Sequence, residues 1–217
     1  MKQLAIFDLD GTLLETIEDL GAACNEVLSR HSLPTYDLTE YKAFVGNGMM
    51  RLVERAIPEE LRTKELINEI RREFIEVYYD NIHTYTTIYP GVSELLTELQ
   101  KREVTLAVAS NKFHDGTRKL VSHYFPNIHF NAVLGQRPDV PLKPNPQIVR
   151  DILNICSFTA DQTIFIGDSG VDIETAKAAG VESIGVTWGF RTRKELEECG
   201  ADHIADTTKV ILKIING

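Results

Sequence analysis

The sequence predicts an α/β fold: a mostly parallel sheet between two layers of helices, plus an α-helical cap domain inserted after the first strand. From Val104 onward, strand-like and helix-like segments alternate, a pattern typical of parallel sheets. Before that, residues 15–83 carry helical patterns with no convincing strand between them. We therefore predict a core domain formed by residues 1–14 and 84–217, and a cap domain formed by residues 15–83.

The predicted strands are short apolar runs, and the predicted helices have apolar stripes or recognisable ends. Pro146 occupies the first turn of one helix, and Gly180 ends another. The predicted strands are residues 4–7, 104–109, 131–134, 163–166 and 181–187. The predicted helices are residues 15–31, 38–44, 49–57 and 64–79 in the cap, and 114–125, 146–155, 171–179 and 192–199 in the core.

The composition excludes several classes of protein. With 217 residues, 43% of them hydrophobic and 25% charged, the chain has the make-up of an ordinary globular protein. The formal charge of -9 argues against a nucleic-acid partner, which requires a basic face. No apolar stretch approaches the ~20 residues of a membrane span, and the first residues lack the features of a signal peptide. We therefore expect a cytoplasmic protein with no membrane partner, and the sequence leaves its oligomeric state open.

Two aspartates directly follow the first predicted strand. Asp8 and Asp10 are two positions apart, so their side chains project to the same side of an extended chain. Like charges that lie so close repel each other, and the repulsion grows as water is excluded. A divalent cation would offset this cost.

Unusual polar residues follow four of the apolar segments of the core. In open α/β sheets, the carboxyl ends of the strands form the ligand crevice. We therefore expect these polar groups to converge there, although they are far apart in the sequence. They are Asp8-Leu9-Asp10-Gly11-Thr12, Ser110-Asn111, Lys143, and Gly167-Asp168-Ser169-Gly170-Val171-Asp172.

Taken in order, the motifs DxDGT, Ser-Asn, Lys and GDSxxD resemble those of the haloacid dehalogenase superfamily, in its phosphatase branch. The helical segment after the first motif resembles the subfamily that carries an α-helical cap at this position. The resemblance covers essentially the whole chain. It implies a Rossmann-like three-layer core and a hydrolase that acts on a small phosphorylated metabolite.

The resemblance also implies catalytic roles. Asp8 would be the nucleophile that forms an aspartyl-phosphate, and Asp10 would be the general acid to the leaving alcohol and then the base for water. Lys143 would neutralise the charge on Asp8 and on the transferring group. Ser110 and Asn111 would offer a hydroxyl and backbone N–H groups to the phosphate oxygens.

By the same resemblance, Mg²⁺ would be held by the Asp8 carboxylate, the Asp10 backbone carbonyl and Asp168. Asp172 begins the following helix, and we expect it to act through water or by holding Lys143 rather than as a direct ligand.

Two residues of the first motif have smaller expected roles at the phosphate. Gly11 would permit a backbone turn there. Thr12 would either orient Asp10 through its hydroxyl or only stabilise the turn.

The predicted cap contains Val45-Gly46-Asn47-Gly48, and similar VGNG segments occur in phosphoglycolate phosphatases. Gly46 and Gly48 would let backbone amides approach a small anion, with Asn47 between them. Arg51 could bind a substrate carboxylate with two hydrogen bonds, although an ordinary solvated arginine remains the alternative. The leading substrate by this reasoning is 2-phosphoglycolate.

Several other functions remain open. Relatives with the same type of cap include inorganic pyrophosphatases, nucleotidases, sugar-phosphate phosphatases and β-phosphoglucomutase. A catalytically idle phosphate-binding regulatory protein is an alternative of another class. The GDSG segment around Ser169 also occurs in trypsin-like proteases, but the alternating pattern opposes their all-β fold.

Overall fold

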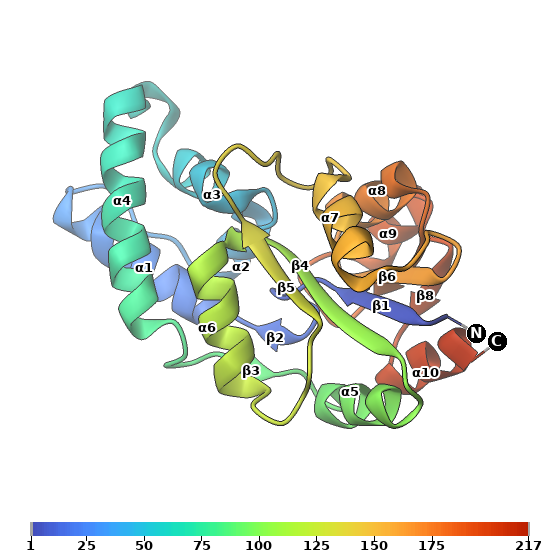
Figure 1. Ribbon diagram of the computed structural model, residues 1–217. Helices are drawn as coiled ribbons and strands as arrows, with labels where there is room; N and C mark the ends of the chain where they lie inside the picture. The colour runs from blue at the N-terminus through green and yellow to red at the C-terminus, as the bar shows by residue number, and fades with distance from the viewer. Residues whose placement is uncertain (1, 217) are drawn as a thin grey trace.

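The core of the protein is a six-stranded sheet in which every neighbouring pair of strands is parallel. The computed structural model describes residues 2–216 (Figure 1). The strand order is β5-β4-β1-β6-β7-β8. The strands are β1 (Leu4–Phe7), β4 (Thr105–Phe113), β5 (Ala132–Gln136), β6 (Thr163–Gly167), β7 (Glu182–Val186) and β8 (His203–Ala205).

Helices cover both faces of this sheet, which explains why its central strands are apolar throughout. One face packs with α5 (Val92–Lys101), α6 (His114–Tyr124) and α10 (Thr208–Asn216). The other packs with α7 (Gln147–Cys156) and α8 (Gly170–Ala179). The short helix α9 (Arg193–Glu198) lies beside the β7–β8 end of the sheet. The core is therefore a three-layer Rossmann-like α/β structure, as the sequence predicts.

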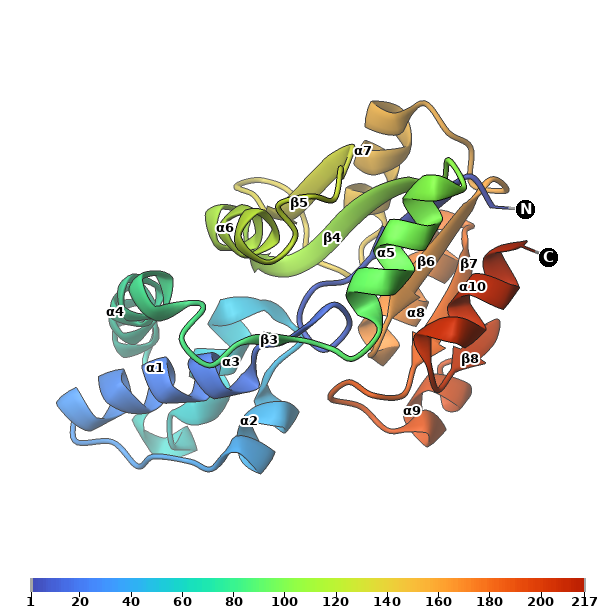
Figure 2. The ribbon, with the colours of Figure 1, turned by 90° about the horizontal axis from the view of Figure 1, so that it is seen from below.

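The cap is a group of helices that lies to one side of the sheet (Figure 2). It consists of α1 (Ile17–Arg30), α2 (Leu38–Phe44), α3 (Gly48–Ala56), a 3-10 turn (Glu59–Leu61) and α4 (Lys64–Asn81). Two chain segments join it to the core. They pair as a small antiparallel ribbon of β2 (Leu14–Glu15) and β3 (Thr87–Ile88). The domain limits that we predict at residues 15 and 83 fall close to this ribbon and stay a prediction.

A buried carboxylate fastens the second of these connecting segments to the cap. The side chain of Asp19, on α1, accepts hydrogen bonds from the backbone N–H groups of Tyr85 and Thr86 and from the Thr86 hydroxyl, at 2.7–2.9 Å. Only 3% of Asp19 is exposed, so these donors are what offsets its loss of hydration. The orientation of α1 relative to the connecting segment depends on this contact.

The sequence pattern predicts most elements to within one or two residues. It is wrong about the end of one strand and does not predict several other elements. We predicted a strand that ends at residue 109, whereas β4 continues to Phe113. Its register against β5 shifts between Ala109 and Phe113, so an irregularity lies within the strand. The pattern did not predict α5, β8, α10 or the ribbon of β2 and β3.

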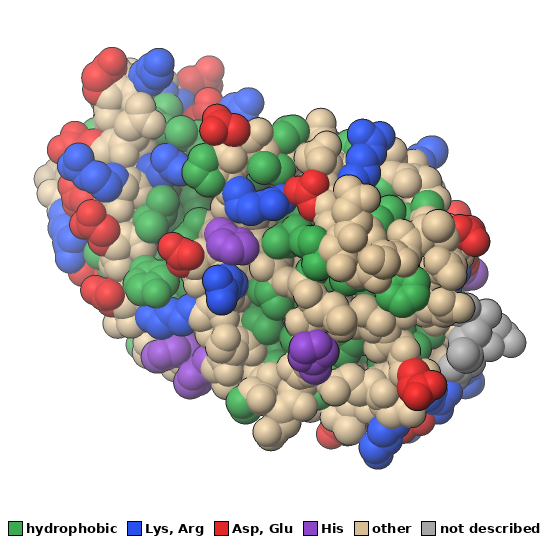
Figure 3. Space-filling view, in the orientation of Figure 1, with side chains coloured by type: hydrophobic (Ala, Val, Ile, Leu, Met, Phe, Trp, Pro, Cys, Tyr) green, Lys and Arg blue, Asp and Glu red, His purple; other side chains and the backbone are tan. Residues whose placement is uncertain are grey.

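Surface charge in this orientation is mixed in sign. Acidic and basic side chains are interspersed over the face that Figure 3 shows. Within residues 2–216, no helix is both long enough and apolar enough to span a membrane.

Candidate active site

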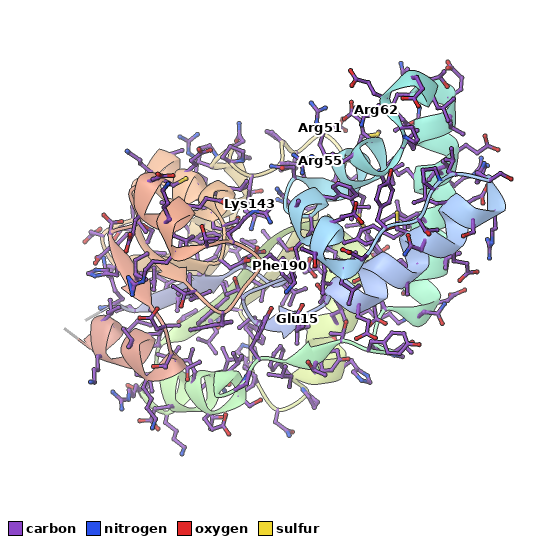
Figure 4. The ribbon with its side chains drawn as sticks, turned by 180° about the vertical axis from the view of Figure 1, so that it is seen from behind. Glu15, Arg51, Arg55, Arg62, Lys143 and Phe190 are labelled. Carbon is purple, nitrogen blue, oxygen red and sulfur yellow. The ribbon has the colours of Figure 1, made fainter. Side chains whose placement is uncertain are left out.

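A pocket lies where the carboxyl ends of β1, β4 and β6 face the cap. Core residues supply its polar side, and Figure 4 shows Lys143 and Phe190 between the core and the cap helices. The polar core residues that line it include Asp8, Asp10, Ser110, Asn111, Lys112 and Asp168. The cap contributes the apolar side chains of Leu20, Val45, Met49 and Leu52. Segments from the whole length of the chain thus meet at one place, as expected for an open α/β sheet.

Lys143 is buried between two carboxylates of this site. Its ammonium lies 3.0 Å from Asp8 Oδ1 and 2.7 Å from Asp172 Oδ1, and it also donates to the carbonyl of Ala109 at 2.9 Å. Burial alone would lower the pKa of Lys143, but Asp172 and Asp8 outweigh burial and hold this pKa above its ordinary value. Lys143 is therefore a permanent cation beside Asp8.

The negative charge around Asp8 is greater than the single positive charge of Lys143 can neutralise. Burial is the largest cause that raises its pKa; Lys143 lowers it, and Asp172 and Asp10 raise it further. The net result is a pKa of about 7 instead of 3.8. The pKa of Asp168 is also well above its usual value because of burial and the neighbouring Asp172 and Asp8. The site thus has an excess of buried negative charge, which a cation would relieve.

The acidic cluster fits a divalent cation. Asp8, Asp168 and Asp172 each offer a carboxylate oxygen, and these oxygens lie within 4.8 Å of one another. Both carboxylate oxygens of Asp172 already accept hydrogen bonds, one from Lys143 and the other from the backbone N–H and the hydroxyl of Ser169. The donor set is hard oxygen, which suits Mg²⁺. Asp8 and Asp168 are the better candidates for direct ligands, and Asp172 is placed to hold Lys143 and begin α8.

Asp10 differs from our expectation in its partners. Of the two alternatives for Thr12, a hydroxyl that orients Asp10 or one that stabilises the turn, the first is not seen, because this hydroxyl lies 3.4 Å from Asp168 Oδ1. The hydroxyl of Thr16 donates to Asp10 Oδ1 at 2.6 Å, and the ammonium of Lys112 lies 3.0 Å from the same oxygen. Thr16 and Lys112, rather than Thr12, therefore hold Asp10 in place.

Gly11 is required by the close approach of two loops. Its φ is +84°, in the left-handed region, and a Cβ built there would lie 2.4 Å from Asp168 Oδ2. The same oxygen accepts a hydrogen bond from the backbone N–H of Phe190 at 2.7 Å. The absence of a side chain at Gly11 therefore lets Asp168 reach its position beside Asp8.

Ser110 and Asn111 lie in the irregular part of β4. Both line the pocket, but the side-chain amide of Asn111 already has partners. It donates to the carbonyls of Gly46 and Lys143, both at 3.0 Å, and accepts from the backbone N–H of Lys143 at 2.8 Å. The side chain of Asn111 therefore ties the Lys143 loop and the cap loop to the sheet, which leaves backbone groups and the Ser110 hydroxyl to face the pocket.

Two of the predicted cap residues are in place and two are not. Gly46 and Gly48 line the pocket. Asn47 turns away and accepts a hydrogen bond from Arg55 at 2.8 Å. Of the two alternatives for Arg51, the structure favours the solvated arginine: its side chain is 62% exposed, pairs with Glu54 at 2.5 Å and points away from the core (Figure 4). The reason is helical periodicity, because α3 buries the face that carries Met49 and Leu52 (Arg51 is on the other side).

Sequence reasoning missed two cations that line the pocket, Lys112 and Arg191. The apolar pattern does not mark Lys112, because this residue follows Ser110-Asn111, beyond the apolar run that ends at Ala109. Arg191 follows β7 and reaches the cap, where it donates to the carbonyls of Lys42 and Val45. No local pattern marks that contact, because its acceptors are backbone atoms far away in the sequence.

Comparison with known proteins agrees with this architecture. The model of the family described as haloacid dehalogenase-like hydrolases matches residues 5–186. A phosphoglycolate phosphatase of Pseudomonas savastanoi pv. phaseolicola is 32% identical over 215 residues, with 97% of this chain and 79% of the relative covered. A phosphoglycolate phosphatase of Aliivibrio fischeri is 31% identical, with 99% of this chain and 96% of the relative covered.

Solved structures agree in the same way. A crystal structure from Lactobacillus delbrueckii subsp. bulgaricus, provisionally named a phosphoglycolate phosphatase, superposes with a TM-score of 0.93 at 31% identity and 99% coverage of both chains. CbbY from Rhodobacter sphaeroides, solved in complex with phosphate, gives a TM-score of 0.81 at 25% identity, with 96% of this chain and 95% of that chain covered.

The chain belongs to the haloacid dehalogenase-like hydrolases. It is an enzyme of the hydrolase class, and among the members of the family it resembles the phosphoglycolate phosphatases over nearly its whole length.

Proposed function

We propose that this protein is a Mg²⁺-dependent phosphomonoesterase that works through an aspartyl-phosphate on Asp8. The observation that carries the proposal is the arrangement around Asp8, where the buried Lys143 ammonium lies 3.0 Å away and the carboxylates of Asp168 and Asp172 complete an acidic cluster. Such a site attracts a phosphoryl group only when a cation balances the carboxylates. Bound Mg²⁺ would supply that balance and would polarise a phosphoryl oxygen.

In the first half of the proposed reaction, Asp8 attacks phosphorus and the bond to the leaving oxygen breaks. Asp8 Oδ1 is engaged by the backbone N–H of Leu9 at 2.7 Å and by Lys143, which leaves Oδ2 as the attacking atom. Lys143 holds Asp8 in place and offsets the charge of the incoming phosphate. Asp10 donates a proton to the leaving oxygen, which requires this carboxyl to be protonated at that moment.

In the second half, Asp10 removes a proton from a water molecule that attacks the aspartyl-phosphate. The phosphorus–oxygen bond to Asp8 then breaks, and inorganic phosphate and the free carboxylate of Asp8 are released. Thr16 holds Asp10 by the hydrogen bond at 2.6 Å, so the same carboxyl is positioned for both proton transfers. The cap above the pocket limits the access of other water molecules.

The leading substrate is 2-phosphoglycolate, a small phosphomonoester with a carboxylate. Support comes from the names of the similar proteins of Pseudomonas and Aliivibrio and from the Gly46 and Gly48 loop above the pocket. The phosphate bound to CbbY supports phosphate chemistry in this fold. Pyrophosphatase, nucleotidase, sugar-phosphate phosphatase and mutase activities are the alternatives that an assay must separate.

The test is phosphate release from a panel of phosphomonoesters and pyrophosphate, with Mg²⁺ and with a chelator. We expect release that depends on Mg²⁺ and is highest with 2-phosphoglycolate. Asp8→Asn should lower turnover by about 1,000-fold or more, because it removes the nucleophile. The exposed acid Asp161 is a matched control, and Asp161→Asn should leave turnover unchanged.

A second measurement tests the covalent intermediate. When the protein is mixed with substrate labelled in the phosphoryl group and quenched in acid, wild-type protein should retain label and the Asp8→Asn variant should not. Label on the Asp8→Asn variant, or full turnover by that variant, would reject the proposed mechanism. Release of phosphate from no member of the panel would favour a regulatory phosphate-binding protein.

A further inference from the structure

A buried lysine beside Asp10 has no role in the reaction described above. The ammonium of Lys112 lies 3.0 Å from Asp10 Oδ1, and the exposed fraction of the lysine side chain is 1%. Burying a charge is costly unless it has partners, so a lysine in this position needs an explanation. The residue also lines the pocket, which means that a ligand there can reach it.

Two structural features hold Lys112 in this position. The irregularity of β4 between Ala109 and Phe113 lets Ser110, Asn111 and Lys112 all line the pocket, whereas a regular strand would turn every second side chain away. From the cap, the hydroxyl of Tyr78 on α4 accepts a hydrogen bond from the Lys112 ammonium at 2.8 Å. The side chain is thus fixed from both the sheet and the cap.

An ammonium group has three N–H donors, and in the described part of the chain Lys112 has two partners, Asp10 and Tyr78. The neighbouring Lys143 is fully used within the described residues, because its three donors face Asp8, Asp172 and a carbonyl. Arg191 also lines the pocket, but its hydrogen bonds go to two cap carbonyls. Lys112 therefore has one donor left for a ligand, and it is the cation that contacts Asp10.

We propose that Lys112 binds an anionic group on the leaving-group side of the substrate, and that it determines specificity for phosphomonoesters that carry a carboxylate next to the ester. This inference rests on the proposed function and deepens it. Asp10 must contact the leaving oxygen to protonate it, so a cation 3.0 Å from Asp10 lies beside the leaving group. In 2-phosphoglycolate the carboxylate carbon is two bonds from that oxygen, within reach of the same ammonium.

Tyr78 gives this contact a second consequence. Burial raises the pKa of Tyr78 well above its ordinary value, so the phenol stays neutral and keeps its proton. It belongs to α4 in the cap, while Lys112 belongs to β4 in the core. Recognition of the leaving group by Lys112 therefore depends on the cap being in the position seen here.

The experiment compares 2-phosphoglycolate with ethyl phosphate, in which a methyl group replaces the carboxylate. Lys112→Met keeps an unbranched side chain that is one atom shorter and removes its charge. We expect the loss in kcat/KM to be about 10- to 100-fold larger for 2-phosphoglycolate than for ethyl phosphate, the size of a charge-assisted hydrogen bond. Any change that acts through Asp10 affects both esters and cancels in this comparison. Tyr78→Phe should also lower kcat/KM for 2-phosphoglycolate relative to ethyl phosphate, by a smaller factor.

The matched control is Lys119→Met. Lys119 is a half-buried lysine on α6 that donates to the carbonyl of Tyr79, outside the pocket, and its replacement should change kcat/KM for neither substrate. Thermal unfolding of each variant checks that the fold is retained. Because both substrates are measured on the same variant, a partial loss of folded protein would cancel in the ratio.

Binding measurements separate this inference from the proposed function. The Asp8→Asn variant cannot form the aspartyl-phosphate, so it is a suitable background for binding. In this background, calorimetric titration should show that Lys112→Met raises the Kd of 2-phosphoglycolate by about 10- to 100-fold and that of ethyl phosphate by little. That result would support the role of Lys112 even if wild-type protein hydrolysed neither ester. Equal losses with both ligands, or no loss with either, would overturn it.

Discussion

Removal of Mg²⁺ should make the stability of this protein depend strongly on pH, through Asp8. The perturbation is a change from pH 5 to pH 8 in the presence of a chelator. Burial, together with the carboxylates of Asp172 and Asp10 and against the opposing effect of Lys143, raises the pKa of Asp8 from 3.8 to about 7 in the folded, metal-free protein. The folded state thus binds the proton more tightly than the unfolded state does.

The sign and the magnitude follow from this difference. Because the pKa is raised on folding, the contribution of Asp8 to stability is most favourable below pH 3.8 and is lost as the pH rises toward 7. At about 1.4 kcal/mol for each pH unit between the two pKa values, the full loss is about 4 kcal/mol. About 3 kcal/mol of it falls between pH 5 and pH 8. A cation bound to the cluster would remove most of this loss.

The assay is urea unfolding of wild-type protein and the Asp8→Asn variant at several pH values. The single tryptophan is a suitable probe because Trp188 Nε1 donates to the carbonyl of Thr12 at 3.1 Å, beside the site. With chelator, the unfolding free energy of the variant minus that of wild-type protein should increase by about 3 kcal/mol from pH 5 to pH 8. The pKa of Asp168 is raised partly by Asp8, so the variant also loses part of the Asp168 contribution, which has the same sign.

Addition of Mg²⁺ completes the test. Wild-type protein should gain stability at pH 8, and the Asp8→Asn variant should gain much less because it has lost a ligand. If the difference between the two proteins is flat from pH 5 to pH 8, the reasoning about Asp8 is wrong. If Mg²⁺ stabilises both proteins equally, the ion binds elsewhere.

Two further substitutions probe the packing around the site. Gly11→Ala would place a methyl group 2.4 Å from an oxygen of Asp168, so kcat/KM should fall by about 100-fold or more. The control is Gly180→Ala. Gly180 also has a positive φ, of +72°, but a Cβ there meets nothing within 4 Å, so this variant should lose only about 1 kcal/mol of stability and keep its activity. Asp19→Asn should lower the unfolding free energy by about 2 kcal/mol, because an amide cannot accept all three hydrogen bonds of the buried carboxylate; the exposed neighbour Glu18, changed to Gln, should leave it unchanged. Phosphate release measures the first effect and urea unfolding the second, and a Gly11→Ala variant with wild-type activity would show that Asp168 does not need its present position.

Periodicity and strand-end residues carried most of the sequence-based prediction. The alternation after Val104 predicted the layered core because parallel strands need crossover helices, and this requirement acts through local pattern. From the residues alone, the meeting of Asp8 and Lys143 could be anticipated only as convergence at one edge of the sheet, and their pairing was implied by the resemblance to a known superfamily. The distances depend on the loops, and no pattern along the chain encodes them.

The misses have specific physical causes. Lys112 reaches the pocket because β4 is irregular, and such an irregularity changes which face a side chain takes without leaving a mark in the apolar pattern. For Arg51, a contact with the substrate and an ordinary solvated position were both left open. The stripe of Met49, Leu52 and Val53 on α3 already placed it on the solvent side, so the helical period contained the better prediction.

The contacts that hold the cap loop over the pocket use its main chain as acceptor. Arg191 donates to the carbonyls of Lys42 and Val45, and Asn111 donates to the carbonyl of Gly46. Every amino acid supplies the same carbonyl, so evolution can exchange side chains on this loop without undoing its attachment. Substitutions on this loop can therefore change which substrates fit the pocket while the loop stays attached to the core in the same way.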